Sequence, residues 1–162
     1  MLIIFCGLPG VGKTAIAREL ARQLGAVYLR IDSAEQALRD AGAARIDDAG
    51  YRVAYAVAAD NLKLGLTVVA DSVNPIALTR EAWRNVATST GIPVLEIEVV
   101  CSDAAEHRRR VESRTSDIAG LALPSWDDVV ARNYEPWGRE HIVIDTAARS
   151  IDQCVRELRN TI

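Results

Sequence analysis

The stretch that decides the fold is Gly7-Leu-Pro-Gly-Val-Gly-Lys-Thr14, which directly follows the apolar run 2–6. It matches the pattern G-x-x-x-x-G-K-[S/T] at every fixed position. Glycines let the backbone turn sharply and aim successive N–H groups inward, and the start of a following helix adds partial positive charge. The stretch therefore predicts a phosphate-binding loop, and a glycine-rich turn without a ligand is the weaker alternative.

The residues after this loop predict a helix and then a repeating strand–helix order. Ile16, Leu20 and Leu24 recur every four residues, and Gly25 ends that helix. Strands are expected at residues 2–6, 27–31, 66–70, 94–100 and 141–144. Such strands are apolar on both faces, which is typical of a parallel sheet covered by helices on both sides. We therefore expect one three-layer α/β/α domain over residues 1–162.

Composition limits the classes of function. Half of the 162 residues are apolar, a quarter are charged, and the net charge is −3. This favours a globular protein and argues against a large nucleic-acid interface. The cysteines Cys6, Cys101 and Cys154 are interpreted as reduced thiols. No apolar run has the length of a membrane span, and residues 1–6 lead into the loop rather than a cleavage site, so a cytoplasmic location is expected.

The loop is predicted to bind the phosphate donor of a phosphoryl transfer. All eight residues are expected to bind the nucleotide: Gly7, Leu8, Pro9, Gly10, Val11, Gly12, Lys13 and Thr14. Lys13 is predicted to reach the β- and γ-phosphates of ATP and to act in catalysis. The Thr14 hydroxyl is predicted to bind Mg²⁺.

With this motif and this order of elements, the chain resembles the short P-loop kinases of the small-molecule and nucleoside-kinase type. These include AAA-type ATP-binding enzymes related to chloramphenicol phosphotransferase, adenylylsulfate kinase, polynucleotide 5′-kinase and zeta toxin. The resemblance extends over nearly the whole chain by element order, and its motif is strong only at residues 7–14. It implies the P-loop NTPase fold, with five parallel strands in the order 2-3-1-4-5.

The acceptor side is expected where strands two and three end. Asp32 follows the second strand, and the resemblance implies that it faces the acceptor hydroxyl. A carboxylate there can orient the hydroxyl and take its proton. The alternative is that Asp32 caps the next helix with Glu35, or that Ser33 does so with Gln36.

Asp71 ends the third apolar run, as in a Walker B strand, and Ser72 and Asn74 follow it. The resemblance implies that Asp71 holds Mg²⁺ or contacts the acceptor. Ser72 and Asn74 are candidate substrate residues at the crevice rim. The alternative is that Asp-Ser-x-Asn-Pro only forms a turn.

An arginine-rich helix precedes a loop that contains Gly and Pro, and together they form an expected lid region at about residues 108–124. Arg110 and Arg114 are four apart and share a helix face. The resemblance implies that one of them contacts nucleotide phosphates and acts in catalysis; the alternative is a solvated face. His107 is expected on the helix surface. The loop after the fifth strand, near Thr146, is expected at the adenine.

These observations predict an enzyme that transfers the γ-phosphate of Mg-ATP to a hydroxyl of a small molecule. Two alternatives stay open: a polynucleotide 5′-hydroxyl kinase, and an ATPase or nucleotide switch without an acceptor. The expected partners are ATP and a small acceptor, with no membrane and no nucleic acid. The protein is expected to be a monomer or a homodimer.

Overall fold

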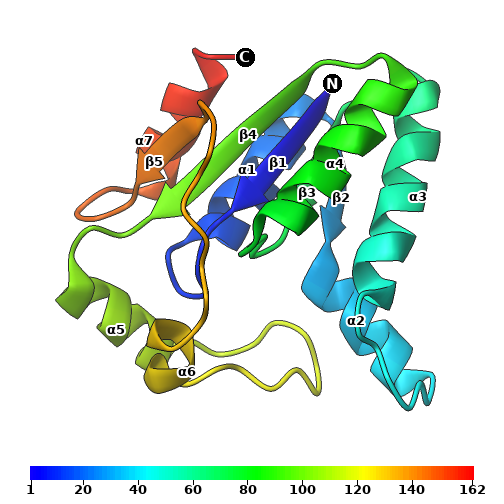
Figure 1. Cartoon of the computed structure of the whole chain (residues 1–162). Helices are drawn as coiled ribbons and strands as arrows, with labels where there is room; N and C mark the ends of the chain where they lie inside the picture. The colour runs from blue at the N-terminus through cyan, green and yellow to red at the C-terminus, as the bar shows by residue number, and fades with distance from the viewer.

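The computed structural model describes residues 1–162 and shows strands and helices in alternation (Figure 1). The strands are β1 (Leu2–Cys6), β2 (Val27–Arg30), β3 (Val68–Asp71), β4 (Val94–Val100) and β5 (Ile142–Asp145). The helices are α1 (Lys13–Leu24), α2 (Ile31–Asp40), α3 (Ala49–Lys63), α4 (Ala77–Thr90), α5 (Ala104–Ser113), α6 (Trp126–Val130) and α7 (Ile151–Arg159).

The strands form one sheet in the order β2-β3-β1-β4-β5, and every neighbouring pair is parallel. This confirms the predicted fold class and strand order. β1 lies in the centre, where Phe5 is in register with Asp71 of β3 and Ile97 of β4. The carboxyl ends of β1, β2 and β3 therefore meet at one edge of the sheet, where ligands of such folds bind.

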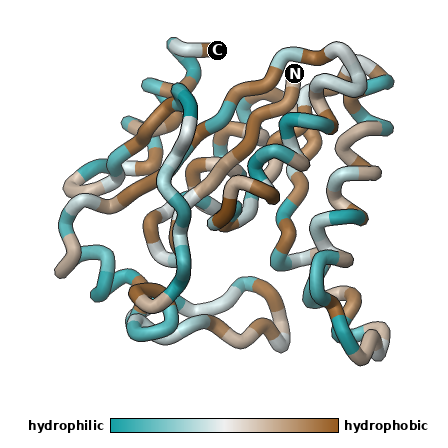
Figure 2. The backbone as a smooth tube through the Cα atoms, in the orientation of Figure 1, coloured by the Kyte–Doolittle hydropathy of each residue, from teal (hydrophilic) through white to brown (hydrophobic).

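The core lies on both faces of β1, and every residue of this strand is buried. Ile3 and Phe5 pack on the face covered by α1 and α7. Leu2, Ile4 and Cys6 pack on the opposite face against α3 and α4, including Trp83. Figure 2 shows hydrophobic residues along these strands, whereas α5 is mostly hydrophilic. Because side chains alternate across a strand, one apolar run supplies both layers.

Several helix ends have capping residues that stabilise them. Gly25 ends α1 at φ 61°, in the left-handed region. The side chain of Asp103 caps α5, and Ser125 and Ser150 form capping boxes at α6 and α7.

The start of α2 differs from the expectation. Ile31 begins the helix, Arg30 precedes it in an extended conformation, and no side chain caps it. The predicted caps, Asp32 with Glu35 and Ser33 with Gln36, are therefore wrong. Asp32 lies inside the first turn, where its negative charge interacts favourably with the helix dipole.

None of the seven helices combines the length and the apolar character that a membrane span requires.

Candidate functional site

The loop between β1 and α1 has the backbone geometry of a phosphate cradle. Its three glycines have φ of 139° (Gly7), 87° (Gly10) and 95° (Gly12). The Gly7 N–H donates to the carbonyl of Val73 at 3.1 Å. A Cβ at Gly7 would lie 2.3 Å from the carbonyl oxygen of Val99. The loop is therefore held between the ends of β3 and β4 in a conformation that excludes side chains at these positions.

Helix α5 packs directly against this loop. The His107 imidazole lies 2.9 Å, Nε2 to oxygen, from the Pro9 carbonyl. A Cβ at Gly10 would lie 2.4 Å from a methyl carbon of Val111. His107 is buried, so the expectation that it lies on the helix surface is wrong. Three arginines follow it directly in sequence, and this charged run concealed that His107 and Val111 form the inner face of α5.

Lys13, Asp71 and Tyr28 form a buried polar group beside the loop. The Lys13 ammonium lies 3.0 Å from Asp71 Oδ1, and the Tyr28 hydroxyl donates to Asp71 Oδ2 at 2.7 Å. Lys13 is 8% and Asp71 2% exposed. Burial alone would raise the pKa of Asp71, but Lys13 and the Tyr28 hydrogen bond outweigh it and leave that pKa below its ordinary value. Asp71 is therefore a carboxylate.

The same residues fit a magnesium ion. Mg²⁺ takes oxygen ligands, keeps several waters and usually uses one or two protein groups together with phosphates. Thr14 directly follows Lys13, whose ammonium pairs with Asp71, so the Thr14 hydroxyl and the Asp71 carboxylate belong to the same end of the loop. No cluster of three His, Cys, Asp or Glu side chains gathers anywhere in the chain. A metal here would therefore need nucleotide phosphates as further ligands.

Ser72 and Asn74 are both buried. The Asn74 amide lies 3.4 Å from the Phe5 carbonyl and 3.4 Å from Cys6 Sγ. Its φ is 46°, and its own carbonyl accepts from the buried Arg80. The Ser72 hydroxyl has no hydrogen-bond partner. The structure therefore places Asn74 in the packing beneath the loop, and neither residue lines the cavity described next.

A cavity of about 1060 Å³ runs from the loop to α2. Gly12, Lys13 and Thr14 line one part of it, and Asp32 lines another. The Asp32 side chain is 46% exposed and lies 3.5 Å, Oδ2 to Nε, from Arg30. The structure thus brings the predicted donor and acceptor residues to one cavity.

Arg110 lines the part of this cavity next to the loop between β1 and α1. Its guanidinium donates to the Thr146 hydroxyl at 2.8 Å, the Thr146 carbonyl at 3.0 Å and Glu106 at 2.6 Å. One of its nitrogens would be 3.9 Å from a Cβ at Gly12. Arg110 therefore connects α5, the loop after β5 and the phosphate loop. The neighbouring Arg109 is exposed on the outer face of α5.

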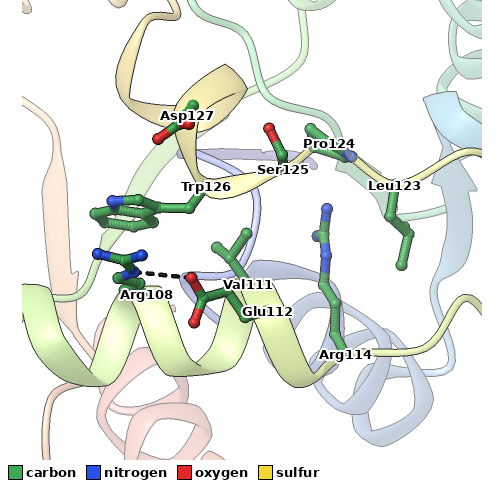
Figure 3. Close-up of a pocket in the computed structure, with 9 residues that line it drawn as sticks. All are labelled: Arg108, Val111, Glu112, Arg114, Leu123, Pro124, Ser125, Trp126 and Asp127. Atoms are coloured by element: carbon green, nitrogen blue, oxygen red, sulfur yellow. Dashed lines mark hydrogen bonds and ion pairs between the residues drawn. The ribbon is translucent and has the colours of Figure 1, made fainter.

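Arg114 directly follows α5 as its C-cap, its side chain makes no hydrogen bond or ion pair, and its Nε is buried. Figure 3 shows its side chain extending from the end of α5 toward Leu123 and Pro124. Besides the large cavity, it lines a smaller pocket of about 440 Å³ between α5 and α6. In that pocket Arg108 pairs with Glu112 at 2.8 Å, away from the phosphate loop.

The 115–124 segment crosses toward α2, and Asp117 fixes it there. The Asp117 carboxylate pairs with Arg18 of α1 and, at 2.7 Å, with Arg30 of β2. These two arginines were not predicted as site residues. They lie 99 and 87 positions from Asp117 in sequence, and no motif connects them. In Figure 1 the segment lies below the carboxyl ends of the strands, between α5 and α2.

Known proteins share this architecture. A family model described as an AAA domain matches residues 2–132. A protein from Chloroflexus aurantiacus assigned as a kinase superposes with a TM-score of 0.75 and 22% identity, covering 99% of this chain and 97% of that one. The APS kinase CysC of Mycobacterium tuberculosis, in complex with AMPPNP and APS, has a TM-score of 0.73 and 22% identity, covering 98% and 95%.

Kti12 of Chaetomium thermophilum, in complex with ADP-AlF3, superposes with a TM-score of 0.63 and 24% identity, covering 100% and 99%. No curated protein matches the chain significantly. At these identities the likeness shows the fold.

Proposed function

The chain belongs to the AAA domain family, and we propose that it is a kinase that transfers the γ-phosphate of ATP to a hydroxyl of a small molecule. The proposal rests on one observation: a single cavity joins the phosphate loop to Asp32. A kinase needs a donor site and an acceptor site that open into each other, because the two oxygens and the transferred phosphorus react in line.

On the donor side, the backbone N–H groups of Gly10 to Lys13 and the start of α1 bind the phosphates of ATP. The Lys13 ammonium neutralises the developing charge, and Arg110 supplies a second positive group beside Gly12. The loop around Thr146, which Arg110 holds, borders the nucleoside.

Thr14 and Asp71 would hold the magnesium ion. A bound ion would neutralise part of the charge on the phosphates. Asp71 also keeps Lys13 at the loop, because its carboxylate is the ion-pair partner of that ammonium.

On the acceptor side, Asp32 orients the hydroxyl and accepts its proton as the new phosphate ester forms. The Asp32 side chain lines the cavity and is 46% exposed, so a substrate hydroxyl can reach it. The 115–124 segment covers the reaction from one side and limits the access of water. Catalysis is then mainly positioning and electrostatic stabilisation.

The test follows ADP release from Mg-ATP in the presence of pooled small hydroxyl compounds. Asp32→Asn should lower the acceptor-dependent rate by about 10²–10⁴-fold, as expected for loss of a general base, while affinity for AMPPNP stays unchanged. Asp40→Asn is the matched control, because this carboxylate lies on the same helix, bonds to Gln36 and lies outside the cavity lining. Full activity in Asp32→Asn would refute the assigned base.

A further inference from the structure

The cavity has a charge opposite to that of the whole chain. The chain has a net charge of −3, yet seven basic side chains and three carboxylates line the cavity. The basic residues are Lys13, Arg18, Arg30, Arg39, Arg110, Arg114 and Arg132, and the acidic ones are Asp32, Glu35 and Asp117. A cavity with an excess of positive charge concentrates anions.

The donor nucleotide accounts for only part of this charge. Lys13 and Arg110 lie at the phosphate loop. Arg30 ends β2, which is separated from β1 by β3. Strands are about 4.8 Å apart, so the end of β2 lies about 10 Å across the sheet from the strand that carries the loop. Arg30 therefore belongs to the acceptor half of the cavity, together with Asp32.

Arg114 lies toward the same half. Burial lowers its pKa, Asp32 raises it, and the charge of Arg30 lowers it further. Arg114 lines the same cavity as Arg30, and Asp117, three residues further along the chain, pairs with Arg30. The segment that begins at Arg114 therefore leads to the end of β2. A partly buried guanidinium without any carboxylate or carbonyl partner is unfavourable, because nothing replaces its lost hydration. An anionic ligand would supply that missing partner.

Arg30 already binds an oxyanion of the protein itself. The Asp117 carboxylate accepts from one of its terminal nitrogens at 2.7 Å. The Arg30 Nε donates no hydrogen bond and lies 3.5 Å from Asp32 Oδ2. The Arg30 side chain is 11% exposed, so its orientation is fixed by packing. The Nε edge of its guanidinium thus has only a long ion pair with Asp32 and no hydrogen bond.

We propose that Arg30 and Arg114 bind an acid group of the acceptor, so that the substrates are small alcohols that carry a phosphate, sulfate or carboxylate. The planar guanidinium has donors that match such groups in pairs. Binding the acid group beside Asp32 positions a hydroxyl of the same molecule at that carboxylate. This inference rests on the proposed kinase function. It assigns Arg114, one of the two arginines that the sequence offered for the nucleotide phosphates, to the acceptor.

The first test measures binding without turnover. Protein saturated with Mg-AMPPNP is titrated with inorganic sulfate, with Arg114→Gln as the test variant. Arg109→Gln is the control, since it removes the same charge from an exposed position on the same helix, outside the cavity lining. Sulfate affinity should fall at least tenfold in Arg114→Gln and stay unchanged in Arg109→Gln. Equal affinity in wild type and Arg114→Gln, or no sulfate binding by the wild type, would overturn the inference.

The second test uses paired acceptors that differ only in the acid group, such as a sugar phosphate against its parent sugar and a hydroxy acid against its amide. The acid member should give faster ADP release, and Arg30→Gln and Arg114→Gln should raise its KM at least tenfold with a smaller effect on kcat. Equal turnover of both members would contradict the inference. So would a preference for 5′-hydroxyl oligonucleotides with the steep salt dependence of nucleic-acid binding.

The two proposals fail in different ways. If the wild type does not bind AMPPNP, the kinase function is wrong. If AMPPNP binds normally, and sulfate binding and acceptor preference do not depend on Arg114, only the anionic acceptor is wrong.

Discussion

The two halves of the cavity are built differently. The donor half is a continuous stretch, Gly7–Thr14, whose backbone is fixed between strands and whose charged residue is buried with Asp71. The acceptor half gathers side chains from separate parts of the chain, Arg30, Asp32, Arg114 and Asp117. Its ion pairs are partly exposed: Asp117 is 52% and Arg18 54% exposed.

This difference indicates which half of the cavity tolerates amino-acid substitution. A phosphate loop depends on backbone shape and on a desolvated charge pair, and both are costly to disturb. Exposed ion pairs contribute little to stability because water screens them. We therefore expect substitutions in the donor half to affect folding, and substitutions in the acceptor half to affect mainly the choice of substrate.

Lys13→Met should have the largest effect. It leaves the buried Asp71 carboxylate without its ion-pair partner, which should lower the free energy of unfolding by about 3–5 kcal/mol at pH 7. Urea unfolding of both proteins checks this value.

The stability lost in Lys13→Met should also depend on pH. In the wild type the lowered pKa of Asp71 stabilises the fold fully above its ordinary pKa of 3.8, and this contribution disappears as the pH falls toward the native pKa. In Lys13→Met burial is uncompensated, so the pKa of Asp71 is raised and protonation relieves the penalty. The difference in the free energy of unfolding between the wild type and Lys13→Met should therefore become smaller at acidic pH. A constant difference from pH 7 to pH 4 would contradict the buried pair.

Gly7→Ala should have the next largest effect. The added Cβ would lie 2.3 Å from a backbone carbonyl oxygen at φ 139°, and the combined strain should cost about 3 kcal/mol. Gly65→Ala is the matched control, because it also has positive φ, at 81°, but open space around the Cβ. It should cost only about 1 kcal/mol. If urea unfolding gave the same loss of free energy of unfolding for Gly7→Ala and Gly65→Ala, the neighbouring strands would not hold the loop.

Asp117→Asn should have the smallest effect on stability. Hydrogen bonds from Arg30 and Arg18 lower the pKa of Asp117 to about 2, but the carboxylate is exposed, so its removal should cost less than about 1 kcal/mol. The exposed Asp60→Asn on α3, which removes an ion pair with Lys63, should behave similarly in urea unfolding. If Asp117→Asn lowered the free energy of unfolding by more than about 2 kcal/mol, the acceptor half would be as sensitive to substitution as the donor half, which would contradict the comparison.

The sequence predicted what depends on local pattern and on strand order. The phosphate loop is contiguous, and Asp71 could be placed near it because parallel strands end at one edge of the sheet. The contacts of Arg30 with Asp117, of His107 with Pro9 and of Arg110 with Thr146 were not predictable, since they depend on how α5 and the 115–124 segment fold back over the sheet. The burial of Asn74 likewise reflects packing under the loop.

The most direct test of the central claim is the fate of the γ-phosphate of ATP, followed by ³¹P NMR with and without a pool of small hydroxyl acids. The two-sided cavity predicts that ADP forms only with acceptor present and that the phosphate appears in a new phosphate ester. Formation of ADP and inorganic phosphate at the same rate in both samples would contradict it and identify the protein as an ATPase without an acceptor.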